Sequence, residues 1–326
     1  MTGDVLDIHG LSLRFDTQQG AVHALRKIDM TVPRGEIVGV VGESGSGKST
    51  LALAIMRLLP GNAVVETGTI AFCGSDLLKL PEDEMRAIRG SRISMVFQDP
   101  MTSLNPVRSI GRQMADIQYR DTTASAAQKR AKSLEALQGV GIPDAASQLD
   151  RFPFQFSGGM RQRIAIAMSL LQKPELLIAD EVTTALDVTL EAQILHLLRE
   201  LRKNINGSIL FISHNLGAIA EICDRVVVLY AGEVVESGPV GEIFNGPRHP
   251  YTKALIACDP ARIEMVTREL PVIPGDVPNL HRIPEACIFA PRCPMAIGRC
   301  HTERPADVVA GPSHRARCHL VGGAPA

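Results

Sequence analysis

Residues 42–50 read GESGSGKST and match the phosphate-loop pattern G-x-x-x-x-G-K-[ST]. The apolar run at 37–41 is typical of a buried parallel strand, and residues 51–59 are rich in helix formers. The sequence therefore predicts the strand, loop and helix that this pattern requires. The alternative, a glycine-rich turn that binds nothing, does not account for the flanking strand and helix.

Each residue type in this loop suits a nucleoside triphosphate with Mg²⁺. Glycines let the backbone curl so that its N–H groups and the start of the next helix face the phosphates. Lys48 places a positive charge beside the β- and γ-phosphates, and Ser49 supplies a hydroxyl for Mg²⁺. We expect the whole loop to contact the nucleotide: Gly42, Glu43, Ser44, Gly45, Ser46, Gly47, Lys48, Ser49 and Thr50.

The first part of the chain predicts antiparallel strands. Residues 5–15 alternate apolar and polar positions, residues 28–32 follow a polar turn, and residues 68–72 form a further candidate strand. An aromatic side chain near such an edge can stack on the adenine of a nucleotide, and Phe15 is the candidate here. A core position for Phe15 is an equal alternative, and His23 is a weaker candidate for adenine.

Two predicted strands end in single polar side chains. Residues 93–97 end at Gln98, and Pro100 then stops strand pairing. Residues 208–213 end at His214. A lone histidine is more often structural than catalytic. Because His214 follows a strand of the same predicted sheet, we expect it to contact the γ-phosphate, and we expect Gln98 to point at the site.

A third strand, at 176–179, ends in two carboxylates, Asp180 and Glu181. Open α/β sheets bind their ligands at the carboxyl ends of the strands. We therefore expect Asp180 to bind Mg²⁺ through water and Glu181 to orient or deprotonate the attacking water. A solvated loop is the alternative for such a run, and the phosphate loop elsewhere in the chain favours catalysis.

Helices are predicted between these strands. Ser157 is a typical helix-starting residue, followed by Gly158 and Gly159. A hairpin that turns at Ala231-Gly232 is expected to end the core. The expected helices cover residues 110–119, 124–140, 160–172 and 188–202.

Composition limits the class of protein. The chain has 326 residues, 45% of them hydrophobic, which is enough for a long domain and an appendage. Lys plus Arg (34) and Asp plus Glu (35) nearly cancel without a long basic run, so we expect no nucleic-acid partner. The sequence has neither an apolar window of membrane-spanning length nor a signal peptide at its start. We expect a cytoplasmic protein that does not itself span a membrane.

The composition changes after residue 241, where Pro and Cys become frequent, so we expect a nucleotide-binding domain at 1–240 and a small module at 241–326. Few large apolar residues occur there, and we expect metal–thiolate bonds to supply order that burial cannot. A zinc ion or an iron–sulfur cluster fits four thiolates, whereas free thiols in a loose tail are the alternative. The candidate ligands are Cys287, Cys293, Cys300 and Cys318.

The order of these features resembles an ABC transporter ATPase across residues 5–240. It comprises the phosphate loop, Gln98, SGGMRQR at 157–163, the Asp180/Glu181 strand, Ala185-Leu186-Asp187 and His214. The segments FQDPMTSLNP (97–106), ADEVTTALDVT (179–189) and HPYTKAL (249–255) are similar to the peptide and nickel importer branch. The resemblance implies an α/β fold: a P-loop ABC nucleotide-binding domain with a RecA-like core, an antiparallel β subdomain and a helical subdomain, followed by a small Cys-rich C-terminal extension.

The resemblance also implies a function and partners. The chain would hydrolyse ATP to drive uptake of peptides or a similar solute, and it would lie peripherally at the cytoplasmic face of the cell membrane. Its partners would be a second ATPase subunit, either identical or related, two transmembrane permease subunits and an extracytoplasmic solute-binding protein. The C-terminal region CIFAPRCPMAIGRC looks like that of peptide-importer ATPases, in which four such cysteines hold a [4Fe–4S] cluster.

Residue roles follow from the same resemblance. Two ATPase domains sandwich two ATP molecules, so Ser157, Gly158 and Gly159 would contact the γ-phosphate held by the other subunit. Asp187 would lie at the seam of this dimer. Gln98 would link the γ-phosphate and Mg²⁺ to the surface that grips the membrane subunits, so the expected Mg²⁺ contacts are Ser49, Gln98 and Asp180.

Val182 departs from the family pattern, which usually has Pro after the catalytic Glu, and this puts the rigidity of the loop in doubt.

The rival function is that of a soluble ABC ATPase that acts on nucleic acid or ribosomes. Such proteins carry long coiled-coil insertions or two ATP domains, and this sequence has neither. A third interpretation makes the tail a redox sensor that gates the ATPase.

Overall fold

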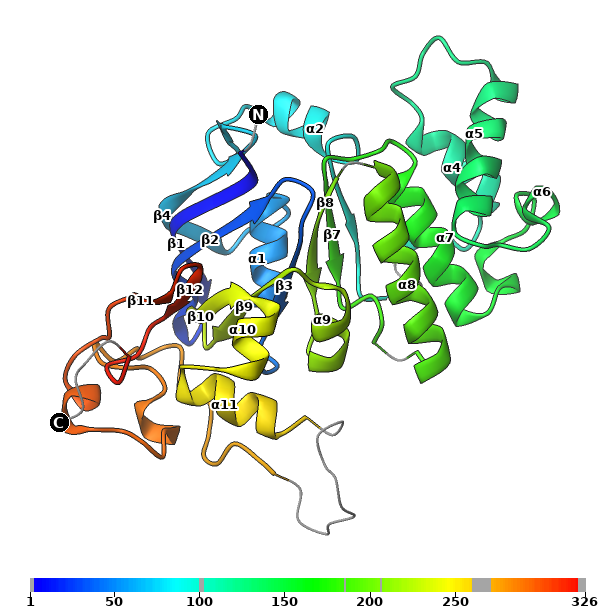
Figure 1. Ribbon diagram of the computed structural model, residues 1–326. Coiled ribbons are helices and arrows are strands. Elements are labelled where there is room, and N and C mark those ends of the chain that lie inside the picture. Colours follow the sequence, from blue (N-terminus) through cyan, green and yellow to red (C-terminus); the bar gives the residue numbers. More distant parts are fainter. Residues whose placement is uncertain (1–2, 100–102, 185, 206, 260–270, 322–326) are drawn as a thin grey trace. The chain divides into compact units, whose positions relative to one another are not determined.

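The computed structural model describes the chain apart from residues 1–2, 100–102, 185, 206, 260–270 and 322–326 (Figure 1). Pro100 and Ala185, named above, lie outside the described residues. The chain divides into two compact units, which we call unit 1 (Met1–Leu80 and Phe211–Ala326) and unit 2 (Pro81–Leu210). Strand β8 (Ser208–Ile212) carries the chain from unit 2 back to unit 1.

An antiparallel sheet forms the first part of unit 1, with strand order β2-β1-β4-β5. Along β1 the apolar side chains of Leu6, Ile8, Leu11 and Leu13 are fully buried, as their alternation with polar residues predicts. The predicted antiparallel strands are confirmed, although each is longer than expected. The strands are β1 (Asp4–Thr17), β2 (Gly20–Pro33), β4 (Ala63–Phe72) and β5 (Ser75–Asp76).

The second sheet of unit 1 has the strand order β11-β12-β10-β9-β3. All of β3 (Ile37–Val41) is buried, and it pairs in parallel with β9 (Arg225–Tyr230). The hairpin from β9 to β10 (Glu233–Pro239) turns at Ala231 and Gly232, whose φ angles of 46° and 82° are both left-handed. The predicted hairpin is therefore confirmed. The helices of unit 1 are α1 (Lys48–Ile55), α9 (Leu216–Ile222), α10 (Val240–Asn245) and α11 (Pro250–Ala257).

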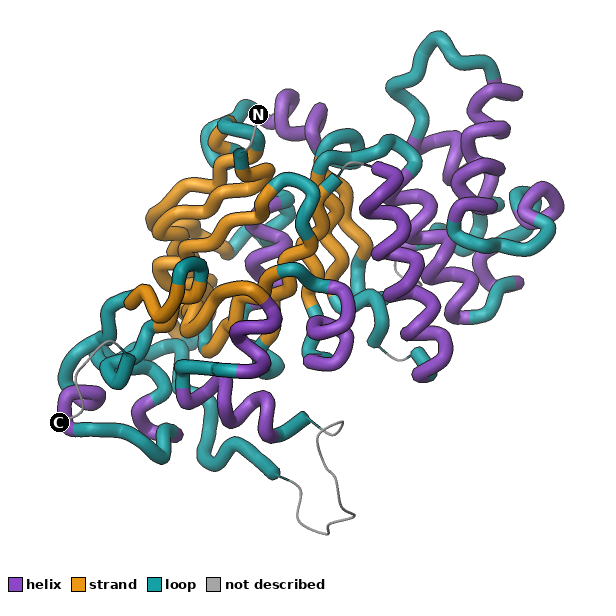
Figure 2. Tube along the Cα trace, in the orientation of Figure 1, coloured by secondary structure: helices purple, strands orange, loops and turns teal. Residues whose placement is uncertain are grey.

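Residues 241–326, which we call the extension, are joined to this sheet. Strand β12 (His314–Ala316) pairs with β10, and β11 (Val308–Gly311) pairs with β12. Figure 2 shows the described chain between α11 and β11 mostly as loop, with short 3₁₀ turns at Ala290–Arg292 and Gly298–His301. Neither strand was predicted, because they are only four and three residues long and pair at long range.

Burial orders part of the extension, which corrects the expectation that metal–thiolate bonds alone would do so. The Phe289 side chain is 1% exposed, and its ring lies edge-on to Tyr230 and Tyr251 at centroid distances of 5.1 and 5.4 Å. The sequence hid this cluster because the three aromatic residues are far apart in the chain and a single Phe gives no periodic signal.

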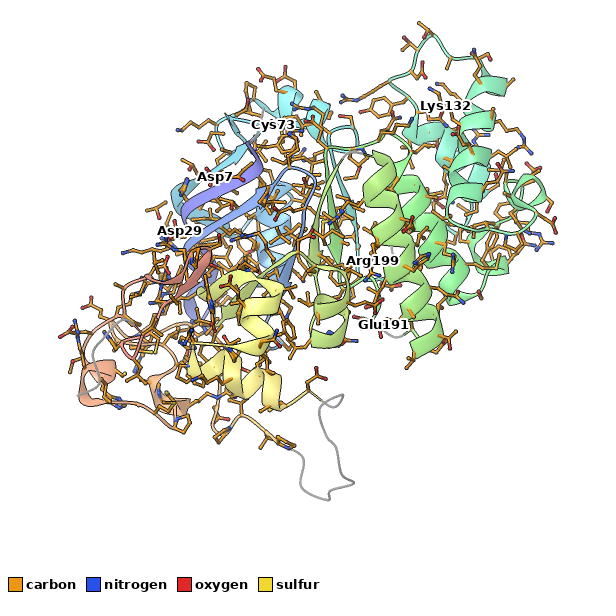
Figure 3. The ribbon with its side chains drawn as sticks, in the orientation of Figure 1. Asp7, Asp29, Cys73, Lys132, Glu191 and Arg199 are labelled. Atoms are coloured by element: carbon orange, nitrogen blue, oxygen red, sulfur yellow. The ribbon has the colours of Figure 1, made fainter. Side chains whose placement is uncertain are left out.

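Buried charge pairs fasten the extension as well. The Glu233 carboxylate on β10 is 3% exposed and lies 3.0 Å from Arg304 and 3.5 Å from Arg317. Arg317 also lies 4.0 Å from Asp29 of β2, which is labelled in Figure 3. Because buried carboxylates are costly unless paired, these arginines hold the extension against β10 and β2.

Unit 2 combines two parallel strands, β6 (Ile93–Val96) and β7 (Leu176–Asp180), with several helices. Helices α4, α5 and α7 pack side by side in this unit (Figure 1). The four helices predicted here are confirmed to within a few residues, whereas α2 and α6 were not predicted. The helices are α2 (Glu82–Ile88), α4 (Ile110–Ile117), α5 (Ala126–Gly139), α6 (Ala145–Gln148), α7 (Gly158–Leu170) and α8 (Val188–Ile205).

Candidate nucleotide-binding site

The phosphate loop runs from the end of β3 to the start of α1, as its sequence predicts. Gly42 lies so close to the backbone that an added Cβ would stand 2.1 Å from the Leu229 oxygen. Gly45 and Gly47 have φ angles of 78° and 103°, which strain any other residue. The loop therefore needs its glycines for its shape as well as for close approach to phosphates.

Lys48 begins α1 and is only 5% exposed. Its Nζ donates hydrogen bonds to the Gly42 oxygen at 2.8 Å and to the Glu43 oxygen at 3.1 Å. The ammonium is thus held against the loop by carbonyl groups, which phosphate oxygens can replace as stronger partners. Ser44, Gly45 and Ser49 are exposed, so the outer face of the loop is open to solvent.

His214 lies at the same end of the parallel strands as this loop. The Ser213 N–H donates to the Val40 oxygen at 3.1 Å, two residues before Gly42. His214 itself is exposed, and Asn215 caps α9 by accepting the Ala218 N–H. The structure therefore places His214 where the sequence predicts, at a strand tip, and its contact with the γ-phosphate stays a prediction.

Phe15 is half-buried on β1, where it lies opposite Val22 of β2 and Ala63 of β4. It is therefore not a fully buried core residue, which keeps it available for adenine. His23 has other partners: its Nδ1 lies 3.5 Å from Glu66, and its N–H donates to the Leu280 oxygen. Phe15 remains the better candidate for the base.

In unit 2, Glu181 follows the buried Asp180 at the tip of β7. Gln98 donates from Nε2 to Glu181 Oε2 at 3.0 Å, and Thr184 donates from Oγ1 to the same oxygen at 3.2 Å. Glu181 also has a left-handed φ of 48°, a strain of about 1 kcal/mol or more that functional sites often carry. The structure thus brings Gln98 to the expected catalytic carboxylate. Val182, the residue that replaces Pro, is 2% exposed.

The Ser157 turn starts α7 in unit 2, and the Ser157 side chain accepts the Met160 N–H at 3.3 Å. Gly158 is exposed, and a Cβ added there would meet no described atom within 4 Å. At Gly159 a Cβ would stand 2.2 Å from the Leu190 side chain. Gly159 is thus required by packing, whereas the Ser157–Gly158 edge is free to receive another molecule.

Asp187 is exposed and accepts the Leu190 N–H on Oδ1 at 2.9 Å. It therefore caps the start of α8, which is a local structural role that the sequence analysis did not assign. The position of Asp187 at the seam of an ATPase dimer stays a prediction.

The four tail cysteines are free thiols that influence one another. Burial, together with the nearby Cys300 and Cys318, raises the pKa of Cys287 to about 11. Backbone N–H groups near the sulfurs act against this rise in pKa: those of Phe289 and Ala290 at Cys287, of Met295 at Cys293, and of Leu320 at Cys318. These donors suit thiolate ligands, and a bound cation would offset the preference for the neutral thiol.

The arrangement of these thiols does not by itself form a ligand set. Across the residues that the structure describes, no group of three or more His, Cys, Asp or Glu side chains is arranged to hold a metal ion. The chemistry of the cysteines and the nearby N–H groups suits a metal centre. In the structure, however, the described sulfurs are not grouped closely enough to form a ligand set.

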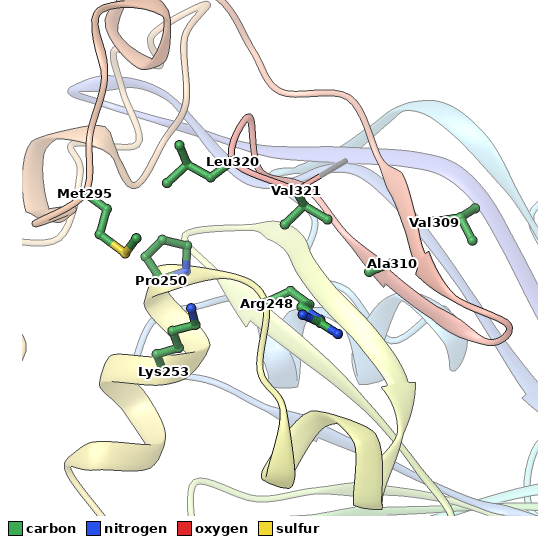
Figure 4. A pocket seen from close by; sticks show the side chains of 8 residues that line it. All are labelled: Arg248, Pro250, Lys253, Met295, Val309, Ala310, Leu320 and Val321. Carbon is green, nitrogen blue, oxygen red and sulfur yellow. The ribbon is translucent and has the colours of Figure 1, made fainter. Parts of the chain in front are cut away.

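A cavity of about 380 Å³ lies elsewhere in unit 1, between α11 and the end of the extension (Figure 4). Its lining includes none of the residues predicted to bind nucleotide. The cavity is lined in part by Arg248, Pro250, Lys253, Met295, Val309 and Leu320.

Over the described residues, no helix combines the length and the apolar character needed to cross a membrane.

Two family profiles match the sequence, and each matches a different part of the chain. The ABC transporter profile matches residues 25–184. The profile of the oligopeptide/dipeptide transporter C-terminal region matches residues 235–300, which include most of the extension.

Curated relatives match almost the whole chain. The probable D,D-dipeptide transport ATP-binding protein of Escherichia coli is 48% identical over 302 residues, 92% of each chain. The oligopeptide transport ATP-binding protein of Bacillus subtilis is 46% identical, over 90% of this chain and 82% of its own. The dipeptide transport ATP-binding protein of Bacillus subtilis is 45% identical, over 97% and 94%.

Solved structures share the fold. A dimeric structure of a bacterial ABC transporter cassette is 26% identical with a TM-score of 0.65, and the match covers 72% of this chain and 98% of that one. A Clostridium perfringens subunit described as part of an ABC transporter complex is 28% identical with a TM-score of 0.65, covering 74% and 91%.

Proposed function

The chain belongs to the ABC transporter family of ATP-binding proteins, and from this premise we propose that it drives the import of peptides or a similar solute. It is an ABC-type ATPase. The proposal rests most directly on its likeness, across nearly the full chain, to relatives named as dipeptide and oligopeptide transport proteins. The rival function, on nucleic acid or ribosomes, gains no support from these relatives.

The residue roles support this activity. Lys48, held against the loop, would move to the β- and γ-phosphates of ATP, and Ser49 and Asp180 would hold Mg²⁺. Glu181 would take the proton of the attacking water, because Gln98 and Thr184 orient its carboxylate. His214 would contact the γ-phosphate from its strand tip, and Phe15 would stack on adenine.

A second ATPase subunit would complete each site. The exposed Ser157–Gly158 edge at the start of α7 offers a hydroxyl and helix N–H groups with no described atom in front of Gly158. The solved cassette with 26% identity is described as dimeric, which favours the same arrangement here. We infer that this edge contacts the γ-phosphate bound by the partner subunit, with Asp187 near the seam.

Mixing two inactive variants tests this arrangement. In a homodimer, a Ser157→Arg chain paired with a Lys48→Ala chain keeps one intact composite site, so the mixture should recover part of the wild-type ATP hydrolysis. The measurement is phosphate release by each variant alone and by the mixture. No recovery would argue for action within one chain or for a different partner that supplies the second half.

The remaining partners follow from import. The chain would bind two transmembrane permease subunits at the cytoplasmic face of the membrane, and an extracytoplasmic protein would deliver the solute. In unit 2, the side chains of Phe97, Phe152 and Phe154 are 38%, 37% and 67% exposed. Exposed aromatic side chains are typical of protein interfaces, so this unit offers apolar contacts for a permease.

We further propose that Cys287, Cys293, Cys300 and Cys318 hold one metal centre, with [4Fe–4S] preferred to Zn²⁺. The support is chemical: the four thiols influence one another's pKa values, and nearby backbone N–H groups at three of the sulfurs favour the thiolate. When bound, such a centre would cross-link the extension. Since Phe289 and the arginine pairs already fasten it, the centre would add local order around the cysteines.

A further inference from the structure

The extension contacts the phosphate loop directly through Arg292. Its Nη1 donates to Glu43 Oε2 at 2.8 Å and its Nη2 donates to Glu43 Oε1 at 3.1 Å, which makes the pair bidentate. The Arg292 side chain is 4% exposed, and Glu43 is the second residue of the loop. A partly buried, two-point ion pair therefore joins a cysteine-rich segment to the nucleotide site.

Arg292 is itself fixed by the extension and by β9. Its Nε donates to the Pro274 oxygen at 2.9 Å and its Nη2 to the Ile273 oxygen at 3.0 Å. Its Nη1 also donates to the Tyr230 hydroxyl at 3.3 Å. A planar guanidinium with all three nitrogens occupied has one orientation, so Glu43 must adapt to Arg292 rather than the reverse.

Tyr251 of α11 holds the backbone of the same residue. Its hydroxyl accepts the Glu43 N–H at 2.9 Å, and its side chain is fully buried. The ring packs against Tyr230 at 4.5 Å and Phe289 at 5.4 Å between centroids, so the hydroxyl position is rigid. Both the carboxylate and the peptide of Glu43 are thus tied to the extension.

These contacts bear on the lysine that binds phosphate. Lys48 Nζ donates to the Glu43 oxygen, so the position of the Glu43 peptide helps to set where Lys48 lies before ATP arrives. An unpaired Glu43 carboxylate beside the triphosphate would also repel it. Pairing with Arg292 removes this repulsion and directs the carboxylate toward the extension.

We propose that Arg292 and Tyr251 are positioning residues of the phosphate loop, through which the extension sets the affinity of the site for ATP. The inference rests on the proposed ATPase function and gives the extension a part in nucleotide binding. The extension also reaches β2, where the His23 N–H donates to the Leu280 oxygen at 3.0 Å. The extension therefore contacts both the phosphate loop and β2 of unit 1.

The test measures MgATP binding to the full chain by equilibrium titration, together with the melting temperature. Arg292→Gln leaves the partly buried Glu43 carboxylate without its guanidinium partner, so the Kd for MgATP should rise about tenfold while kcat stays within about twofold. Tyr251→Phe keeps the ring and removes only the acceptor, so the Kd should rise about threefold. The exposed Arg282 provides the matched control, and Arg282→Gln should bind as the wild type does.

Rescue separates positioning from a general loss of structure. Adding Glu43→Gln to Arg292→Gln removes the unpaired charge, so the double variant should bind MgATP more tightly than Arg292→Gln does, by about threefold or more. A double variant that binds no better than Arg292→Gln overturns the proposal. So does wild-type affinity in Arg292→Gln or, if that variant does not fold, in Tyr251→Phe.

The proposed ATPase function can fail separately. Wild-type chain that does not bind MgATP contradicts that function, and the inference falls with it. Wild-type binding that Lys48→Ala abolishes and Arg292→Gln leaves intact contradicts only the positioning role.

Discussion

Glu181→Gln should lower ATP turnover by about 100-fold or more and leave MgATP binding unchanged. The amide keeps the shape of the side chain, and one oxygen can still accept from Gln98 and Thr184. It cannot take a proton from water, so the chemical step is lost while the bound state remains. Phosphate release and nucleotide titration on the same preparation measure the two effects.

Two further variants sharpen this result. Glu175 precedes β7 and pairs with Arg92 at 2.6 Å, so Glu175→Gln is a matched change that should leave turnover near the wild-type rate. Lys48→Ala should instead weaken MgATP binding by about 30-fold or more, because it removes a buried cation from the phosphates. A wild-type hydrolysis rate in Glu181→Gln would remove Glu181 from the mechanism.

Cys293→Ser should abolish metal binding by the extension. Anaerobic purification followed by iron, sulfide and zinc analysis should find iron and sulfide in the wild-type chain and little of either in the variant. Because the phosphate loop and Lys48 are unchanged, ATP should still bind.

The outcome of the metal analysis discriminates between the alternatives. Near-stoichiometric zinc without iron would show that the four cysteines hold zinc and not an iron–sulfur cluster. A wild-type chain without metal would leave four free thiols, and the order of the extension would then rest on contacts such as those of Phe289 and the Glu233 ion pairs.

Much of the ATPase core could be predicted because its signals are local. The five buried residues of β3 are contiguous in sequence, and the Ala231-Gly232 turn lies between two apolar runs. Gln98 and Glu181 each follow a parallel strand, and β6 and β7 are neighbours, so their side chains meet. Strand tips identified from sequence therefore predicted which groups would converge.

The extension could not be predicted in the same way, because its structure depends on pairing over long range. The three residues of β12 show no periodicity, and they form a strand only because β10 offers an edge. Arg292 is hidden in a segment whose cysteines suggest a metal site, and its partner Glu43 lies far away in the chain. The left-handed φ of Glu181 likewise has no sequence signal.

Solute uptake by the complete assembly tests most directly whether ATP hydrolysis by this chain drives import. The chain is purified from its own membranes with the proteins that accompany it, and the assembly is placed in lipid vesicles with labelled peptide. We predict that two permease proteins accompany the chain and that ATP drives peptide accumulation, which Glu181→Gln abolishes. A chain that purifies with ribosomes or nucleic acid and without membrane proteins would contradict the account.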